Sequence, residues 1–163
     1  MIDSGTGGLP LAPGESRRVV DERLFRFLVD LEVVKAQRLQ YCISVVCLAA
    51  DLAAAEADRL SMPHILAGVL RRTRATDVVT QMPDRSLAVL LVDAETTALA
   101  GVVGRLRDEL TAVTGANAPV TTWSVGGACY PKTATGPAEL IRLATDLLAR
   151  ASLDGGNRVY IAT

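Results

Sequence analysis

Two short apolar segments, 77–81 and 87–92, are separated by only five residues, among them Pro83 and Asp84. Proline presets the backbone torsion of a turn, and aspartate favours turns because its side chain bonds to nearby backbone N–H groups. Parallel strands need a crossover of about a dozen residues, so these two segments are predicted to pair as an antiparallel hairpin. We therefore expect a sheet that contains this hairpin.

Strand and helix patterns surround the hairpin on both sides. Segment 43–49 is almost continuously apolar and predicts a strand buried on both faces. Further strands are predicted at 120–130 and 158–161, and helices at 20–40, 51–74 (interrupted near Pro63), 94–113 and 137–151. This order predicts an α+β fold of the palm-like or ferredoxin-like kind, a sandwich in which helices flank a mostly antiparallel central sheet.

The first predicted helix has apolar residues at three- and four-residue steps, the period of an amphipathic helix. They are Leu24, Phe25, Leu28, Leu31 and Val34. We expect these residues to form the apolar face of the helix.

Length and charge limit the classes of function. The 163 residues suit one domain, and 1–19, which begin with many glycines and prolines, are expected to be a flexible lead-in to a folded domain at 20–163. Seventeen Lys and Arg against eighteen Asp and Glu leave a net charge of −1, so no general attraction to nucleic acid or membrane lipid is expected. The longest apolar stretch is too short to cross a bilayer and no signal-peptide pattern is present, so a cytoplasmic protein is expected.

The cysteines and the histidine form no recognisable metal or disulfide pattern. Cys42, Cys47 and Cys129 lie in or beside apolar runs and are expected to be buried, reduced thiols. His64, the only histidine, cannot form a metal cluster alone. We expect it at or near the surface.

Several short segments between residues 31 and 159 carry a family resemblance when they are taken in order. They are 32–38, 43–49, 74–82, 87–91, 123–128, 139–144 and 155–159. Their order and spacing resemble those of GGDEF domains, the family that includes the diguanylate cyclases. The resemblance implies the GGDEF type of α+β fold for 20–163.

The signature positions depart from the family pattern. In place of Gly-Gly-Asp-Glu-Phe the chain has Pro83, Asp84, Arg85, Ser86 and Leu87. In the family the glycines let the backbone approach GTP and the acidic pair holds metal ions, whereas proline lacks an N–H and arginine repels a divalent cation. The first metal aspartate of the family falls on Ala49, and its phosphate-binding lysine on Ser152. The resemblance therefore implies a degenerate domain that is not an enzyme and holds no metal or cofactor.

The chain also has residues that match a second site of the family. Arg74-Ala-Thr-Asp77 lies five residues before the signature stretch, as does the Arg-x-x-Asp inhibitory site of GGDEF domains, and the second arginine of that site falls on Arg105. In the family this site binds cyclic di-GMP. Arginine forms paired hydrogen bonds to guanine or phosphate, and a carboxylate accepts from the guanine edge. The resemblance implies a cyclic di-GMP receptor that uses Arg74, Asp77 and Arg105 and transmits occupancy by forming a homodimer or recruiting a protein partner.

Other interpretations of these residues stay open. Arg74 and Asp77 equally fit a local ion pair near a helix end, and the chain would then be a ligand-free protein-interaction or dimerisation scaffold. A third interpretation is a nucleotide-binding domain that uses Asp51 and Asp84. Asp51 is more often a helix N-cap than a metal ligand, and Trp123 is more often a core residue than a stacking platform.

Overall fold

The computed structural model describes residues 16–115 and 121–163. The described strands form one six-stranded sheet with the order β1-β3-β4-β2-β5-β6. The strands are β1 (Val19–Val20), β2 (Ile43–Ala50), β3 (Val78–Gln81), β4 (Leu87–Val92), β5 (Trp123–Tyr130) and β6 (Val159–Ile161). The helices are the 3-10 turn η1 (Ser16–Arg18), α1 (Glu22–Leu39), α2 (Ala54–Ala57), α3 (Met62–Arg71), α4 (Thr96–Gly115) and α5 (Pro137–Leu153). The predicted α+β class is confirmed.

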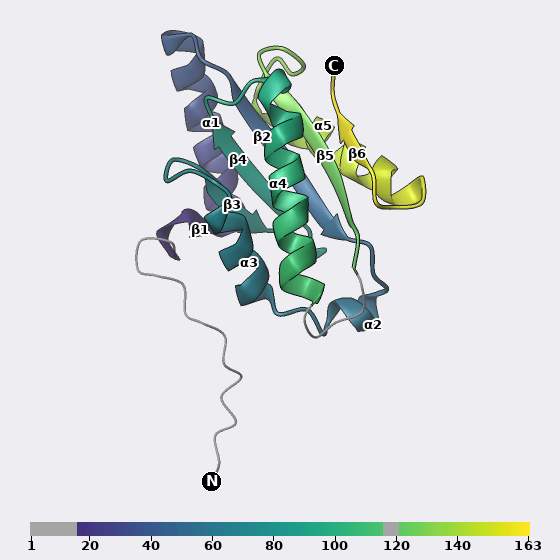
Figure 1. Ribbon diagram of the computed structural model, residues 1–163. Helices are drawn as coiled ribbons and strands as arrows, with labels where there is room; N and C mark the ends of the chain where they lie inside the picture. Colours follow the sequence, from purple (N-terminus) through teal and green to yellow (C-terminus); the bar gives the residue numbers. More distant parts are fainter. Residues whose placement is uncertain (1–15, 116–120) are drawn as a thin grey trace.

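Helices cover both faces of the sheet (Figure 1). One core lies between the sheet and the helices α1 and α5, and the other lies between the sheet and the helices α3 and α4. The central strand β2 serves both cores because its side chains alternate: Val45 and Cys47 point to the first core, and Val46 and Leu48 to the second. The prediction of a strand buried on both faces is confirmed.

The predicted hairpin is present and antiparallel. Strands β3 and β4 pair in the register Val79↔Val89, and the turn closes with the N–H of Met82 donating to the carbonyl of Ser86 at 2.8 Å. Asp84 stabilises the turn, because its Oδ1 accepts from both the N–H (3.0 Å) and the hydroxyl (2.6 Å) of Ser86. The turn at 82–86 is thus held by a backbone hydrogen bond and by the Asp84 side chain.

Only some of the apolar residues predicted to mark the amphipathic helix α1 face the sheet. The residues that pack against the sheet are Phe25, Val29, Val33 and Ala36. Of the five residues predicted, Phe25 is buried and Leu28 half-buried, whereas Leu24, Leu31 and Val34 are exposed. The helix has apolar residues on two sides, and only packing against the sheet selects one of them. The helix itself is well capped, with Asp21 Oδ1 accepting from the N–H of Leu24 at 2.7 Å.

The folded region starts before residue 20. Residues 16–19, which the sequence predicts to be part of the lead-in, form η1 and the first residue of β1, which pairs in parallel with β3. Arg18 holds this segment in place, since its guanidinium donates to the carbonyls of Leu70 (3.0 Å) and Arg74 (2.6 Å). A two-residue strand is too short to show a sequence period. Residues 1–15 of the expected lead-in lie outside the described residues.

Smaller predictions can also be compared with the structure. Cys47 and Cys129 are buried and Cys42 is half-buried, all with free thiols. Burial raises the pKa of the Cys47 thiol to about 12. Strand β5 begins at Trp123, later than predicted, and residue 120 lies outside the described residues. Within 16–115 and 121–163, no helix combines the length and apolarity needed to cross a membrane.

Candidate ligand-binding site

Arg74, Asp77 and Arg105 line one small hollow of about 60 Å³. Arg74 and Asp77 lie in the loop between α3 and β3, and Arg105 lies on α4. Helices α3 and α4 pack against each other on the same face of the sheet, and this packing brings the loop next to Arg105. The structure therefore brings together the three residues that the sequence singled out.

Asp77 is the buried member of the group, with 4% of its surface exposed. Its Oδ2 accepts from the N–H of Arg74 at 2.8 Å, and its Oδ1 accepts from the N–H of Val92 at 3.0 Å. These bonds close the turn that carries Arg74 and attach it to the end of β4. Each carboxylate oxygen retains a further lone pair, so the role of Asp77 as an acceptor for guanine stays a prediction.

The arginines at the end of α3, in the loop after it and at position 105 of α4 fall into two groups. Arg71 and Arg72 both pair with Glu109 of α4, at 2.8 and 2.7 Å. Hydrogen bonds from Arg71 and then Arg72 lower the pKa of the Glu109 carboxyl. The guanidinium groups of Arg74 and Arg105 make no hydrogen bond or ion pair with another described residue. Arg74 and Asp77 therefore do not form the local ion pair that was the alternative interpretation.

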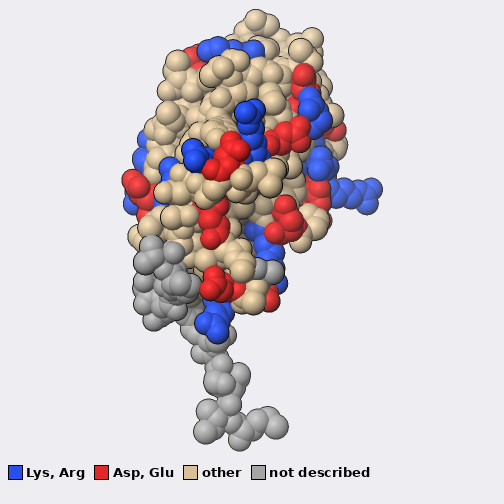
Figure 2. Space-filling view, turned by 90° about the vertical axis from the view of Figure 1, so that its right-hand side faces the viewer, with Lys and Arg blue, Asp and Glu red and all other residues tan. Residues whose placement is uncertain are grey.

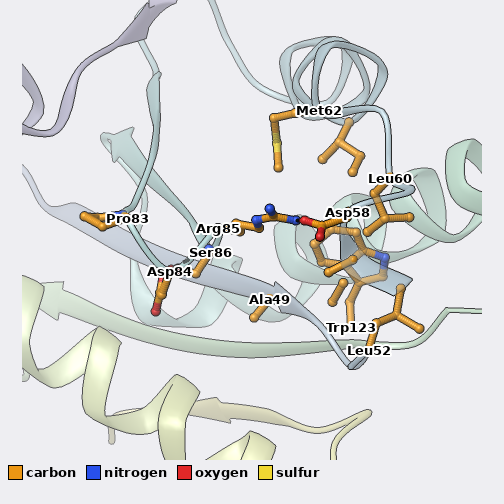
Figure 3. Close-up of a pocket in the computed structure, with 13 residues that line it drawn as sticks. Ala49, Leu52, Asp58, Leu60, Met62, Pro83, Asp84, Arg85, Ser86 and Trp123 are labelled. Atoms are coloured by element: carbon orange, nitrogen blue, oxygen red, sulfur yellow. Dashed lines mark hydrogen bonds and ion pairs between the residues drawn. The ribbon is translucent and has the colours of Figure 1, made fainter. Parts of the chain in front are cut away.

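A roomier pocket of about 410 Å³ lies between the hairpin turn and the α2–α3 region (Figure 3). Its lining includes the signature positions 83–86, and its other walls are mostly apolar. Arg85 reaches from the turn to form an ion pair with Asp58. Trp123 also lines this pocket and is 3% exposed, so it is a core residue, as expected. Sequence reasoning missed this pocket because a period does not show which distant segments face a turn.

Asp51 is a structural link and not the helix N-cap that was expected. Its carboxylate accepts from the hydroxyls of Thr122 (2.7 Å) and Ser124 (2.6 Å) and from the N–H of Asn157 (2.8 Å). It thus joins the ends of β2 and β5 to the loop before β6. Asp84 is likewise engaged within its own turn. In the described parts of the chain no three His, Cys, Asp or Glu side chains are grouped to hold a metal ion.

Most of the surface that Figure 2 shows is uncharged. Acidic and basic side chains are scattered over it close to one another, and no large area of a single sign is visible. This agrees with the net charge of −1. On this face, attraction of a charged ligand would have to come from individual residues rather than from a broad field.

No protein-family model and no curated protein sequence matches the chain. Solved structures do match it. The GGDEF domain of YfiN (TpbB) from Pseudomonas aeruginosa has a TM-score of 0.74 and 20% identity, covering 88% of this chain and 96% of that one. The GGDEF domain of DgcB from Caulobacter crescentus, in complex with c-di-GMP, has a TM-score of 0.76 and 16% identity, covering 99% and 94%. The active GGEEF domain of a diguanylate cyclase from Vibrio cholerae has a TM-score of 0.76 and 12% identity, covering 88% and 97%.

These matches correct one prediction and confirm another. The expectation that the chain is not an enzyme is contradicted, because its structural neighbours are domains of diguanylate cyclases, which are enzymes, and one is described as active. The described residues do not show that this chain is inactive. The resemblance found in the sequence is confirmed at the level of the fold: the chain has the fold of a GGDEF domain.

Proposed function

We propose that the chain is a receptor for cyclic di-GMP, which it binds at the hollow lined by Arg74, Asp77 and Arg105. The observation that carries the proposal is that two arginines without described side-chain partners, one from a loop and one from a helix, converge on one hollow. A cyclic dinucleotide offers phosphate charges and guanine edges, and arginine binds either with paired hydrogen bonds. DgcB, a structural neighbour, was solved with c-di-GMP. Such a receptor would work in the cytoplasm.

The hollow is much smaller than the ligand. Its volume of about 60 Å³ is well below the roughly 300–1,000 Å³ of a pocket that encloses a small molecule. One guanine edge or one phosphate would enter it, and the rest of the ligand would lie across the surface of the α3–β3 loop and α4. The exposed part of the ligand would then be open to a second protomer or a partner protein, which would transmit occupancy.

Isothermal titration of the folded chain with cyclic di-GMP tests the proposal. Arg74→Ala and Arg105→Ala are each expected to lower the affinity about tenfold or more, because one bidentate arginine contact contributes about 1–3 kcal/mol. Arg142→Ala is the matched control: Arg142 is an exposed arginine on α5 whose guanidinium pairs with Asp146 at 3.0 Å. It removes the same charge and is expected to leave the affinity unchanged.

Two outcomes would reject the receptor function. One is the absence of binding heat at high micromolar ligand with a folded protein. The other is an equal loss of affinity in Arg142→Ala and Arg74→Ala, which would indicate general charge attraction and no specific site. The assay reports binding alone, so its outcome does not depend on whether the chain has an enzymatic activity.

A further inference from the structure

Helix α1 presents a row of apolar side chains to solvent. The row consists of Leu24 (43% exposed), Phe27 (60%), Leu31 (44%) and Val34 (63%), and we name it the outer stripe of α1. At about 100° per residue, these positions lie roughly 180° around the helix from Phe25, Val29, Val33 and Ala36, which pack against the sheet. Single exposed apolar residues are ordinary, but a continuous row on one helix face marks an interaction surface.

The spacing of the outer stripe is that of a helix that pairs with another helix. Its residues follow one another at steps of three, four and three, which is the a-d-a-d pattern of a coiled-coil seam. The stripe spans about 15 Å of the helix axis, too short for an isolated coiled coil to form. Here, however, α1 is already held on its sheet and capped by Asp21. Pairing therefore requires no additional free energy to form the helix.

Charges beside the outer stripe favour a second copy of this chain as the partner. In the heptad frame that places Leu24 and Leu31 at a, Asp30 takes position g and Lys35 position e. In a parallel pair, position g faces position e of the next heptad on the partner helix. Asp30 of each copy then lies beside Lys35 of the other. The contact forms twice, because a two-fold axis relates the two copies. An antiparallel pair would instead bring the two Asp30 carboxylates together.

Both charged groups are exposed and can reach a partner. Asp30 is exposed and makes no hydrogen bond or ion pair with another described residue. Lys35 is half-exposed and contacts Glu32 on its own helix at 2.7 Å, which leaves two of its ammonium donors for other groups. Because the sheet packs on the opposite side of α1, the two sheets of a pair would lie on the outside of the joined helices.

We propose that the outer stripe of α1 is a self-association surface through which two copies pair, with their α1 helices parallel. This interface is isologous, since the same residues contribute on both sides. It does not involve the hollow at Arg74 and stands whether or not the chain binds a cyclic dinucleotide.

Sedimentation of the full chain over a range of concentrations tests the surface. The wild-type chain is expected to form dimers as concentration rises, and Phe27→Lys with Val34→Lys is expected to be monomeric throughout. Leu153→Lys is the matched control, because Leu153 is 86% exposed at the end of α5. It should associate like the wild type. Far-ultraviolet circular dichroism would establish that each variant is folded.

Charge reversal tests the parallel orientation. Asp30→Lys places like charges at both cross-helix contacts and is expected to raise the dimer dissociation constant by roughly fivefold. The double variant Asp30→Lys, Lys35→Asp restores opposite charges and is expected to recover the wild-type value. A monomeric wild-type chain at every concentration, or a Phe27→Lys, Val34→Lys variant that still dimerises, would overturn the surface. An unchanged dissociation constant in Asp30→Lys would overturn the parallel arrangement.

Discussion

Asp77 lines the proposed binding site and accepts hydrogen bonds from the backbone N–H groups of Arg74 and Val92. The first contact closes the turn that presents the Arg74 guanidinium, and the second attaches that turn to the end of β4. The proximity of Arg74 and Asp77 could be predicted from their spacing in the sequence. The contact with Val92 could not, because it depends on how the hairpin brings the end of β4 beside the turn.

Removing the Asp77 carboxylate should destabilise the fold as well as the site. We expect Asp77→Ala to lower the free energy of unfolding by about 2 kcal/mol or more, because it leaves backbone donors without their partner in a buried place. Asp77→Asn, which keeps an accepting oxygen, should cost less. Asp58→Ala is the control, since the pair of Asp58 with Arg85 is exposed and such pairs contribute about 1 kcal/mol or less. Urea unfolding measures all three, and equal stability of Asp77→Ala and Asp58→Ala would contradict the role of Asp77.

At the scale of elements, helix α5 lies very close to strand β5. A Cβ on Gly126 would collide with the backbone of α5, at the carbonyl of Ala144 and the N–H of Leu148. Gly127, the next residue, faces the other side of the sheet, where the nearest atom to an added Cβ is Ile161 Cγ1 at 3.6 Å. This close approach explains physically why a glycine is needed in the segment 123–128.

Adding a methyl group to each glycine separates close packing from glycine flexibility. Gly126→Ala is expected to lower the free energy of unfolding by about 3 kcal/mol, because backbone atoms of α5 cannot move aside without shifting the helix. Gly127→Ala is expected to change it by less than about 1 kcal/mol. Thermal or urea unfolding of the two variants checks this. Similar losses in both would mean that α5 does not constrain Gly126.

The elements also differ in how well their sequence patterns predict them. The strand β2 was recognised because it is apolar at every position except Ser44, which suits burial on both faces. Helix α1 was recognised as a helix, but its pattern did not show which side packs inward, because Leu24, Leu31 and Val34 are as apolar as Phe25 and Val29. Periodicity shows that a side is apolar and does not show what covers it. The strand β1 has only two residues and so carries no pattern.

At the scale of the whole molecule, ligand binding should stabilise the folded chain. A ligand present at about 100 times its dissociation constant contributes about 2.7 kcal/mol to stability, so cyclic di-GMP is expected to raise the melting temperature by several degrees. Cyclic di-AMP offers the same phosphates without a guanine edge and should raise it less. Differential scanning fluorimetry measures this, with Arg74→Ala as the variant that loses the shift. An equal shift with both dinucleotides would argue against guanine recognition at the hollow.

The convergence of Arg74 and Arg105 was expected only through a family resemblance, since a loop and a helix distant in sequence meet only after α3 and α4 pack together. The pocket beside the hairpin was not foreseen, because its walls come from β2, the α2–α3 region, the turn and Trp123. The role of Asp51 was not foreseen either, because its hydrogen-bond partners lie on β5 and in the loop before β6. Each of these features joins segments that no local pattern connects.

By itself the sequence determined where most strands and helices form and that they build an α+β sheet with a hairpin, because local spacing of apolar residues and turn residues controls secondary structure. Only the tertiary structure decided which side of α1 packs inward and which carboxylates link distant segments of the chain. It also decided which arginine side chains form ion pairs and which have no partner among the described residues. Those outcomes depend on contacts between distant segments, and such contacts arise only when the layers of the fold pack.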